Sequence, residues 1–401
     1  MNIRIICALR FHYFLMKNAL GRSGVYPKLY TVWPRFKLHR YLDNLENITS
    51  YYFLAPAFYL IPKIRSMKIS HYFEYAVKFL FANLALKNLE DNEVIIFCST
   101  YLYPVLKRRM VKKSINIVDH GSLHPAHESE LMHNENVTYG FKSQGNSVSP
   151  FLDDMLQEEF ESCDAVFVYS KLAKRTFIKH GVPEGKIFVN KMDFSSSLRD
   201  EKFTPRTFEV GNTAQIKLLY VGAVIPRKGI HRLLEAIERC ELSFSVKLIC
   251  VGAKAADESL CNILEKHRNK IEVVQVGMVS EPELKGFYQE ADFFVLPSIC
   301  DGFGMVTAQA LANQCCCIVS AGAGSSELIE NNVSGFILSD VHNVDLLCKE
   351  LQNIFSISSS KYNYIRQRGF KTACDLYDCN SFSQTLTDNL QLVSNRVRNT
   401  G

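Results

Sequence analysis

Residues 297–335 read PSICDGFGMVTAQALANQCCCIVSAGAGSSELIENNVSG, and this stretch decides the fold. A buried strand, Phe293–Leu296, comes just before it, and the glycine-flanked turn 301–304 precedes a helix that should begin near Met305. A second strand, Cys316–Ser320, leads into a second small-residue turn at 322–327. Strand, turn and helix in repeated order, with short connections, predict a parallel sheet built from right-handed crossovers.

The same alternation runs through the rest of the chain. Polar, turn-rich residues 195–214 form the best candidate linker between two sheets. Most of the predicted strands end in small residues, as in doubly wound domains that open a ligand crevice at the carboxyl edge of the sheet. The strands expected besides the two above are 3–8, Val94–Cys98, 115–118, 165–169, 218–221, 246–251 and 273–276.

The predicted fold is therefore α/β, with two doubly wound, Rossmann-like domains that face each other across a cleft. We place the N-terminal domain at residues 1–205 and the C-terminal domain at residues 213–375. Residues 376–401 are expected to form a helix that packs back on the first domain. Ser170 is expected to cap the helix that follows strand 165–169.

Composition fits a large globular protein. Of 401 residues, 47% are hydrophobic and 22% are charged, which argues against long disorder, collagen and a disulfide-stapled miniprotein. The 13 cysteines include three adjacent ones at 315–317, and most lie in apolar runs. They are best interpreted as buried, reduced thiols of a cytosolic protein, and the lack of any C-x-x-C pair makes a structural zinc site unlikely.

Charge is concentrated in the first part of the chain. Residues 1–113 hold 18 Lys and Arg, 6 Asp and Glu, and 21 of the 46 aromatic residues. That composition suits an anionic membrane surface, an anionic acceptor or RNA, and equally a solvated basic face over an aromatic core. The uncharged run 47–62 contains Pro56 and falls short of the ~20 residues of a bilayer span, so we expect no targeting or spanning segment.

Three segments could carry chemistry. The turn 301–304 opens a helix, where backbone N–H groups attract anions and glycines admit a ligand, and Gln309 lies about two helical turns further on. The turn 222–229 also follows a strand, so Lys228 can reach over the sheet edge toward a diphosphate. The loop with His120, His124 and His127 could bind a metal, hold imidazoles at a cleft edge, or carry incidental surface histidines.

These segments together resemble the retaining glycosyltransferases of family 4, also known as glycosyl transferases group 1, which have the GT-B fold. VGAVIPRKGIHRLLEAI resembles the opening of the family's second domain, and PSICDGFGMVTAQAL resembles its PSxxEGFGxxxxEA signature. AGAGSSELIENNVSGF, VDHGSLHPAHESELMHNE and ESCDAVFVYSKLAKRTFIKHGVPEGKIFVNKMDF match further family segments in the right order. The resemblance spans most of the chain.

The sequence departs from the family pattern at informative positions. Asp301 and Gln309 stand where the family has two glutamates, and Ala223 stands where it has an arginine. Asp301 keeps its charge on a shorter arm, and Gln309 can still hydrogen-bond a ribose hydroxyl. Lys228, helped by Arg227, is left to hold the diphosphate. The family's PxGVD tail is degraded to residues 190–193.

The resemblance implies a nucleotide-diphosphate-sugar donor on the second domain and a glycan or lipid-linked acceptor on the first. The catalytic candidates are Asp301, which accepts hydrogen bonds from the donor sugar, Lys228, and His124, which matches the family's loop histidine beside the sugar. No metal or other cofactor is implied, and the sequence has no D-x-D pair. The expected donor-binding residues are Gly222, Arg227, Lys228, Gly252, Gly277, Met278, Asp301, Gly302, Phe303, Gly304, Gln309 and Glu327.

The function expected from the resemblance is sugar transfer in cell-surface polysaccharide or glycolipid synthesis, in the cytoplasm or on the inner face of the membrane, without nucleic acid. One alternative is a GT-B scaffold that binds nucleotide-sugars without turnover, as the altered positions 223, 301 and 309 suggest. Another is a GT-B relative with other chemistry, such as an epimerase or a phosphorylase. The expected membrane contact lies in residues 1–113, above all in the basic stretch 107–113 and in the uncharged stretch 51–62.

Overall fold

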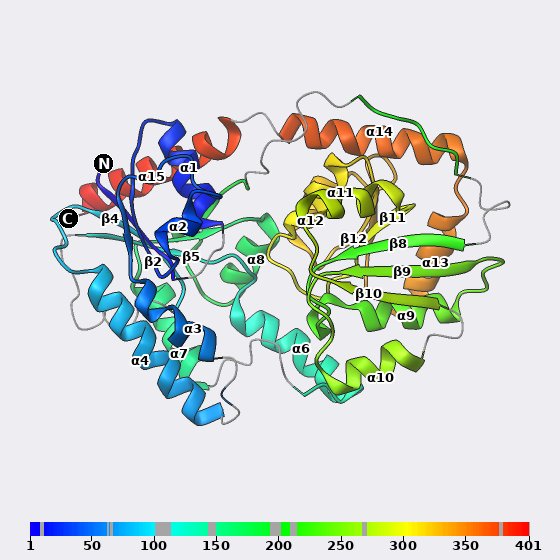
Figure 1. Ribbon diagram of the computed structural model, residues 1–401, viewed down its shortest axis with the longest axis horizontal. Helices are drawn as coiled ribbons and strands as arrows, with labels where there is room; N and C mark the ends of the chain where they lie inside the picture. Colours follow the sequence, from blue (N-terminus) through cyan, green and yellow to red (C-terminus); the bar gives the residue numbers. More distant parts are fainter. Residues whose placement is uncertain are drawn as a thin grey trace.

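The computed structural model describes residues 1–8, 12–61, 64, 67–100, 114–142, 150–192, 202–208, 215–266, 271–376 and 380–400. Two α/β lobes lie side by side, and each is built around its own parallel sheet (Figure 1). The prediction of two doubly wound sheets is therefore confirmed.

The N-terminal sheet has seven parallel strands in the order β3-β2-β1-β4-β5-β6-β7. Its strand order reverses between β1 and β4, and a doubly wound sheet leaves a ligand crevice beyond the carboxyl ends of its strands at that point. The strands are β1 (Ile3–Ile6), β2 (Lys28–Thr31), β3 (Ile48–Ser50), β4 (Val94–Cys98), β5 (Ile115–Asp119), β6 (Ala165–Val168) and β7 (Ile187–Val189).

Helices cover both faces of this sheet, which is why its central strands are apolar runs rather than alternating patterns. On one face Phe81 of α4 packs with Ile95 and Phe97, and on the other Leu20 of α1 packs with Ile5. The helices of this lobe are α1 (Tyr13–Arg22), α2 (Arg35–Leu38), α3 (Ala55–Leu60), α4 (Met67–Ala85), α6 (Pro125–Tyr139), α7 (Pro150–Ser162) and α8 (Lys171–Lys179), with the short 3₁₀ turns η1 (Tyr52–Leu54) and η3 (Glu184–Lys186).

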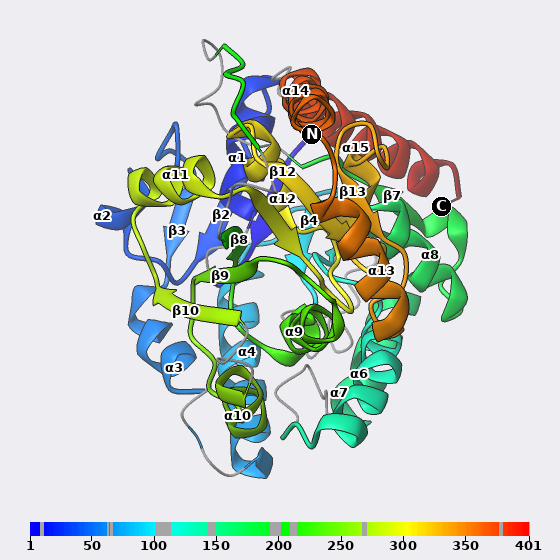
Figure 2. The same ribbon diagram turned by 90° about the vertical axis from the view of Figure 1, so that its right-hand side faces the viewer.

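The C-terminal sheet has six parallel strands in the order β10-β9-β8-β11-β12-β13, with its reversal between β8 and β11. Figure 2 shows α11 and α14 on one side of this sheet, and α9 and α13 on the other. The strands are β8 (Gln215–Val221), β9 (Ser245–Val251), β10 (Ile271–Gly277), β11 (Phe293–Leu296), β12 (Cys316–Ser320) and β13 (Phe336–Leu338). The helical segments are η4 (Pro226–Lys228), α9 (Ile230–Arg239), α10 (Glu258–Lys266), α11 (Glu281–Glu290), α12 (Met305–Ala312), η6 (Gly324–Leu328), α13 (Val344–Phe355) and α14 (Ser359–Leu376).

The last helix, α15 (Asn380–Thr400), returns to the N-terminal lobe and lies along α1 (Figure 1). Ser383 Oγ donates a hydrogen bond to the carbonyl oxygen of Ala19 at 2.6 Å, and Leu386 and Leu390 are buried in the N-terminal core. The proposed boundaries at 205 and 213 stay predictions, because residues 209–214 of the connection lie outside the described part of the chain.

Several local expectations agree with the structure. β4, β11 and β12 have the expected bounds, and the Ser170 hydroxyl caps α8 by accepting a hydrogen bond from Ala173 N at 2.9 Å. The described cysteines are free thiols, as expected, and burial raises the pKa of Cys315 to about 12. Within the described residues, no helix combines the length and the hydrophobicity that crossing a bilayer requires.

Candidate active site

Asp301, Lys228 and Arg227 lie together at the carboxyl edge of the C-terminal sheet. The Asp301 carboxylate pairs with Lys228 Nζ, and Arg227 Nη1 lies 4.0 Å from Asp301 Oδ1. Asp301 is buried, and its backbone is fixed from both sides: its N–H donates to the Gly322 carbonyl at 3.0 Å, and its carbonyl accepts from Gly324 N at 2.9 Å. The structure thus brings three predicted donor-site residues into one charged cluster.

Local backbone geometry places these side chains. The turn η4 is joined to β8 by residues 222–225 and ends at Gly229, whose φ of 69° suits glycine. A β-carbon at Gly229 would lie 2.0 Å from the Pro297 carbonyl oxygen, so the turn can approach the end of β11 only with glycine there. Arg227 Nη1 also donates to the Cys300 carbonyl at 3.1 Å. Both basic residues are therefore held against the turn 301–304.

Burial and neighbouring carboxylates have opposite effects on the pKa of Arg227 in this cluster. Burial alone would lower the pKa of Arg227, but the carboxylates of Asp301 and Glu128 outweigh it and raise that pKa. Glu128 belongs to α6 of the N-terminal lobe and is buried, so this lobe also contributes charge to the cluster. Two cations and two carboxylates thus lie near one another where the lobes meet.

The lobes touch at Gly302, with no room for a side chain. A β-carbon there would lie 2.3 Å from the Gly121 carbonyl oxygen and 2.4 Å from Ser122 Cα. The Ser170 hydroxyl donates to the Gly302 carbonyl at 2.6 Å. The loop after β5 and Ser170, at the start of α8, therefore pack on the turn that holds Asp301, and the carboxyl edges of the two sheets face each other.

Glu327 and Phe303 lie at the same junction. Glu327 Oε1 accepts a hydrogen bond from Leu172 N at 2.7 Å, in the first turn of α8. Phe303 is buried against the N-terminal core. In the described structure both residues bind the opposite lobe, and their predicted roles toward the donor stay predictions.

Three predicted glycines form a row along the same sheet edge. Gly222 N donates to the Val251 carbonyl at 2.8 Å, and Gly252 N donates to the Gly277 carbonyl at 2.9 Å. A β-carbon on Gly252 would lie 2.2 Å from the Gly222 carbonyl oxygen, so these strand ends must be bare backbone. Met278, directly after the row, is 83% exposed. The three glycines thus leave bare backbone at the ends of β8, β9 and β10, and their predicted role toward the donor stays a prediction.

Gln309 and Gly304 belong to α12. Gly304, with a φ of 84°, is the N-cap residue of α12. Gln309 is half-buried, and its Oε1 lies 3.4 Å from the hydroxyl of Tyr288, a contact at the limit of a hydrogen bond. The amide group is therefore held loosely on the face of α12 next to α11.

His124 lies apart from the charged cluster. It is buried at the N-terminus of α6, where its Nδ1 accepts a hydrogen bond from Ala126 N at 3.3 Å and its ring stacks on His180. Burial lowers its pKa to about 3, so the imidazole is neutral at neutral pH. No contact joins it to Asp301 or Lys228 among the described residues, and its role beside the donor sugar stays a prediction.

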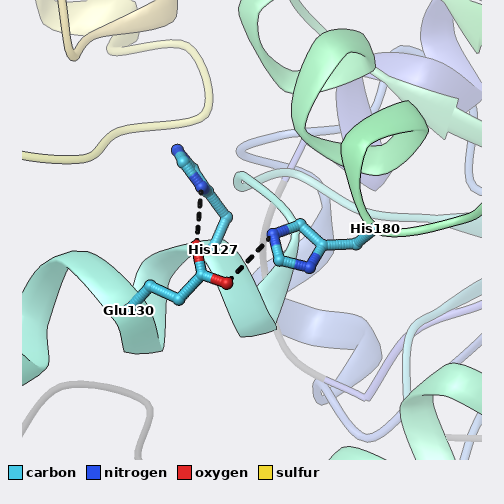
Figure 3. A group of neighbouring side chains, drawn as sticks. All are labelled: His127, Glu130 and His180. Atoms are coloured by element: carbon cyan, nitrogen blue, oxygen red, sulfur yellow. Dashed lines mark ion pairs between the residues drawn. The ribbon is translucent and has the colours of Figure 1, made fainter.

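Nearby, His127, Glu130 and His180 form a group whose ligand atoms lie within 4.8 Å of one another (Figure 3). The two ring nitrogens lie 3.6 Å and 3.8 Å from the Glu130 carboxylate. The ammonium group of Lys179 already lies 2.9 Å from that carboxylate and 3.4 Å from His127 Nδ1. A metal ion would have to displace this lysine, so the group is better explained as an ion-pair cluster. His120 is not in this group, since its two nitrogens contact Ser99 Oγ and the Leu123 carbonyl.

A buried ion-pair network fixes α6 to the C-terminal lobe. Glu135, fully buried, lies 2.7 Å from His231 Nε2, 2.8 Å from Arg232 Nη2 and 2.9 Å from His342 Nδ1. Although burial would raise the pKa of Glu135, hydrogen bonds from these three residues hold that pKa well below its usual range. The network holds in place the helix that follows the loop packed on Gly302.

Sequence reasoning missed one group at the edge of the N-terminal sheet: His12, Asp119 and Tyr169. His12 Nε2 lies 2.5 Å from Asp119 Oδ2, and the Tyr169 hydroxyl donates to Asp119 Oδ1 at 2.6 Å. The available signal is weak, because Asp119 is only the first residue of the loop that follows the predicted strand 115–118. His12 lies more than 100 positions earlier, and only the parallel arrangement of β1 and β5 beside β4 makes the two neighbours.

Comparison with solved structures identifies the architecture. HepE of Anabaena in complex with UDP-glucose is 15% identical, with a TM-score of 0.62 over 98% of this chain and 99% of that one. Sucrose-phosphate synthase of Thermosynechococcus elongatus is 14% identical, with a TM-score of 0.66 over 97% and 98%. The fold is GT-B. At these identities the likeness establishes the fold alone.

The match to a known protein family lies in the C-terminal lobe. Residues 205–372 match the family described as "Glycosyl transferases group 1". A glycosyltransferase of Methanocaldococcus jannaschii is 28% identical over 182 residues, which are 44% of this chain and 47% of the relative. CapM of Staphylococcus aureus, a capsular polysaccharide biosynthesis glycosyltransferase, is 28% identical over 45% of this chain and 49% of its own length.

One relative is similar over a longer part of the chain. The lipopolysaccharide 1,2-N-acetylglucosaminetransferase of Salmonella typhimurium is 22% identical over 75% of this chain and 73% of its own length. The first two relatives, by contrast, are matched over only about half of their length. Together these similarities support a glycosyltransferase with the GT-B fold, whereas membership of family 4 and retention of configuration stay predictions.

Proposed function

We propose that this protein is a retaining glycosyltransferase of family 4, which moves a sugar from a nucleotide-diphosphate sugar to a glycan or lipid-linked acceptor in the synthesis of a cell-surface polysaccharide or glycolipid. The observation that carries the proposal is the cluster of Asp301, Lys228 and Arg227, placed between two facing GT-B sheets inside the segment that matches glycosyl transferases group 1. HepE, which has this fold, is described in complex with UDP-glucose.

The chain's own residues supply what the reaction needs. Lys228 and Arg227 offer cationic donors for the diphosphate, and the glycine row 222, 252 and 277 offers backbone for the base. As the sugar–phosphate bond breaks, negative charge grows on the leaving diphosphate, and prearranged cations lower the barrier most where charge develops. A donor diphosphate competes with Asp301 for Lys228, which frees the Asp301 carboxylate to accept hydrogen bonds from the sugar. The sugar transfer proposed for these residues uses no metal ion or other cofactor.

A GT-B protein that binds nucleotide-sugars without turnover remains the second candidate. It is favoured by Ala223 and Gln309, which replace an arginine and a glutamate of the family pattern, and by the tight pairing of Lys228 with Asp301. The two candidates differ in turnover, not in binding.

The first prediction is that a nucleotide-diphosphate sugar raises the melting temperature of the purified protein and is consumed by it. A panel of UDP-, GDP- and ADP-sugars is screened by thermal shift, and each stabilising compound is then followed for release of its nucleoside diphosphate. Anomeric proton NMR of the glycoside tests retention, and EDTA tests metal independence. Stabilisation without release supports the binding protein, and no stabilisation by any member contradicts both candidates.

We also propose that the N-terminal lobe docks on an anionic membrane that carries the acceptor. Exposed large apolar side chains gather on η1, α3 and α4 of this lobe: Tyr52, Phe53, Tyr59, Leu60, Tyr72 and Leu80. They include part of the uncharged stretch 51–62, whereas the basic stretch 107–113 lies outside the described residues. Apolar side chains beside a basic excess suit reversible attachment, with roughly 1 kcal/mol from each basic residue near the surface.

The second prediction is that the protein floats with liposomes containing phosphatidylserine at low salt, and is released at high salt because screening weakens the attraction. The triple variant Tyr52→Ser, Phe53→Ser, Tyr59→Ser is expected to lose most of this binding. The control variant Tyr364→Ser, Leu392→Ser removes exposed apolar side chains elsewhere and should bind like the parent. Equal recovery on neutral and anionic vesicles would leave a soluble acceptor as the better proposal.

A further inference from the structure

A cavity lies on the side of the C-terminal lobe that is remote from the donor cluster. Its volume is about 380 Å³, and Gln289 of α11 and Asn313, at the end of α12, line it. These two helices end just before β11 and β12 begin. The cavity is therefore at the amino edge of the sheet, whereas Asp301 and Lys228 lie at its carboxyl edge. Its size falls in the range of ~300–1,000 Å³ that is usual for small-molecule sites.

Three cationic side chains line this cavity: Lys202, Arg206 and Arg366. The first two belong to residues 202–208, which run along α14, the helix that carries Arg366 (Figure 1). The other described lining residues are uncharged, so none of the described residues around the cavity brings a negative charge. Three like charges around one space attract an anion to it.

Arg366 is buried without a counter-charge. Its side chain is 1% exposed, and an arginine stays protonated in a protein. Nε donates to the Gln314 carbonyl at 2.8 Å, and Nη1 donates to the Thr204 carbonyl at 3.3 Å and to Asn363 Oδ1 at 3.0 Å. All three acceptors are neutral, and no carboxylate of the described residues forms an ion pair with this guanidinium. A buried charge is costly unless an opposite charge pairs with it.

The surroundings of Arg366 leave that cost only partly compensated. The rings of Phe203 and Tyr362 lie 5.3 Å and 5.4 Å from its guanidinium carbon, and aromatic faces attract a cation without neutralising it. Burial lowers the pKa of Arg366, and the positive charge of Arg206 lowers it further. Nη2 has no hydrogen-bond partner within the described residues, so this nitrogen remains available to a ligand in the cavity.

Arg206 and Lys202 also lack a carboxylate partner in the described part of the chain. Arg206 is half-buried, and its Nη1 donates to the Ala291 carbonyl at 3.0 Å. Asp292 is close enough for the charge of Arg206 to affect its pKa, but its carboxylate accepts a hydrogen bond from Lys217 N at 2.8 Å and forms no ion pair with Arg206. Lys202 is exposed. An anion in the cavity would therefore meet cations that no described carboxylate already neutralises.

Gln314 holds the wall of the cavity in place. Its backbone φ is 60°, in the left-handed region that favours glycine. Its side chain bridges the neighbouring segment, because Oε1 accepts from Thr204 N at 2.8 Å and Nε2 donates to the Lys202 carbonyl at 2.9 Å. The backbone that carries Lys202 is thus fixed to the end of α12, close to Arg366, before any ligand binds.

We propose that this cavity binds a small phosphate-bearing anion, at a site separate from the donor site. Three cations suit the two negative charges and several acceptor oxygens of a phosphate group better than a monoanionic carboxylate, and guanidinium groups match phosphate oxygens in geometry. The phosphate can be inorganic or belong to a phosphorylated sugar, whose hydroxyl groups the amides of Gln289 and Asn313 could bind. The proposal goes beyond the proposed function and does not rest on it.

The third prediction is that the protein binds a hexose 6-phosphate and inorganic phosphate, but not the free hexose, in titration calorimetry at low salt. Arg206→Gln should weaken the binding of both phosphate compounds about tenfold or more, because one charge-assisted contact is lost. Its melting temperature without ligand should stay near the parental value. Arg368→Gln, which changes an exposed arginine of α14 outside the cavity, is the matched control and should bind like the parent.

Two comparisons locate the site and identify the source of the phosphate. Lys228→Ala should bind the hexose 6-phosphate like the parent, since Lys228 lies at the opposite sheet edge. Tighter binding of the hexose 6-phosphate than of inorganic phosphate supports the site with a phosphorylated sugar as its ligand, and equal affinity supports it with phosphate itself.

Absence of binding of both phosphate compounds to the parent overturns the proposal. Binding that Lys228→Ala loses and Arg206→Gln keeps also overturns it, because the anion would then occupy the donor site. Where Arg206→Gln fails to fold, Lys202→Gln, which changes an exposed side chain, replaces it, and parental affinity in that variant overturns the proposal. None of these measurements uses a sugar donor, so a failure of the proposed transferase function is seen separately.

Discussion

Lys228→Ala is expected to lower kcat/KM for the nucleotide-sugar donor by about ten- to a hundredfold while the protein stays folded. Lys228 is proposed as the main cation for the diphosphate, because Ala223 stands where the family pattern has an arginine. Loss of one charge-assisted contact costs roughly 1.5–3 kcal/mol, which corresponds to that range of rates. Steady-state kinetics and nucleoside-diphosphate affinity give the measurement.

Removing Lys228 could lower the stability of the protein as well as its affinity for the diphosphate, so the experiment must separate these two effects. Lys228 pairs with the buried Asp301 carboxylate, so its removal leaves that charge with Arg227 alone, 4.0 Å away. The double variant Lys228→Ala, Asp301→Asn removes both charges and should recover the melting temperature but not the affinity for the diphosphate. Lys142→Ala, which breaks an exposed ion pair with Glu258, is the control. Full activity and nucleotide affinity in Lys228→Ala would show that the diphosphate binds elsewhere.

The strands that the sequence predicts well are the central ones. β4, β11 and β12 are buried on both faces, and a continuous apolar run bounded by small residues is an unambiguous signal for such a strand. β2, β3, β7 and β13 were missed, and each has only three or four residues at or beside the edge of its sheet. Short edge strands carry too few residues to show a period, and pairing with a neighbour, not their own pattern, defines them.

That Asp301, Lys228 and Arg227 lie together was predictable, because they belong to two local segments of the sequence. Asp301 and Lys228 each follow a strand that ends at the same sheet edge, so the strand order alone brings them together. His12 and Asp119 could not be found in this way, since the pair depends on which strands flank β4 and on a short contact between distant residues. Glu327 illustrates a further limit: its position in the family pattern suggested the donor, whereas in the structure its carboxylate accepts a hydrogen bond from the backbone of α8.

Asp301→Asn is expected to reduce kcat more than Gln309→Ala does, by roughly ten- to a hundredfold for a lost charged hydrogen bond. In the proposed reaction Asp301 accepts hydrogen bonds from the donor sugar, so its contact should strengthen as charge develops at the anomeric carbon. An interaction made only in the transition state lowers kcat when it is removed. The donor KM of Asp301→Asn should change little, because the amide keeps the shape of the side chain.

Gln309→Ala should instead raise the donor KM and leave kcat close to the parental value. Gln309 is expected to contact only the ribose, which is bound equally in the ground state and the transition state, and such uniform binding appears in KM. Its loose contact with Tyr288, at 3.4 Å, leaves the amide free to turn toward the sugar of the nucleotide. Gln309→Glu restores the residue of the family pattern and is the matched variant, which should keep a near-parental KM.

A fall in kcat for Gln309→Ala with a raised KM for Asp301→Asn would show that the two roles are reversed. Parental kcat and KM in both variants would show that neither side chain acts on the donor, and would contradict the proposed placement of the donor sugar and ribose.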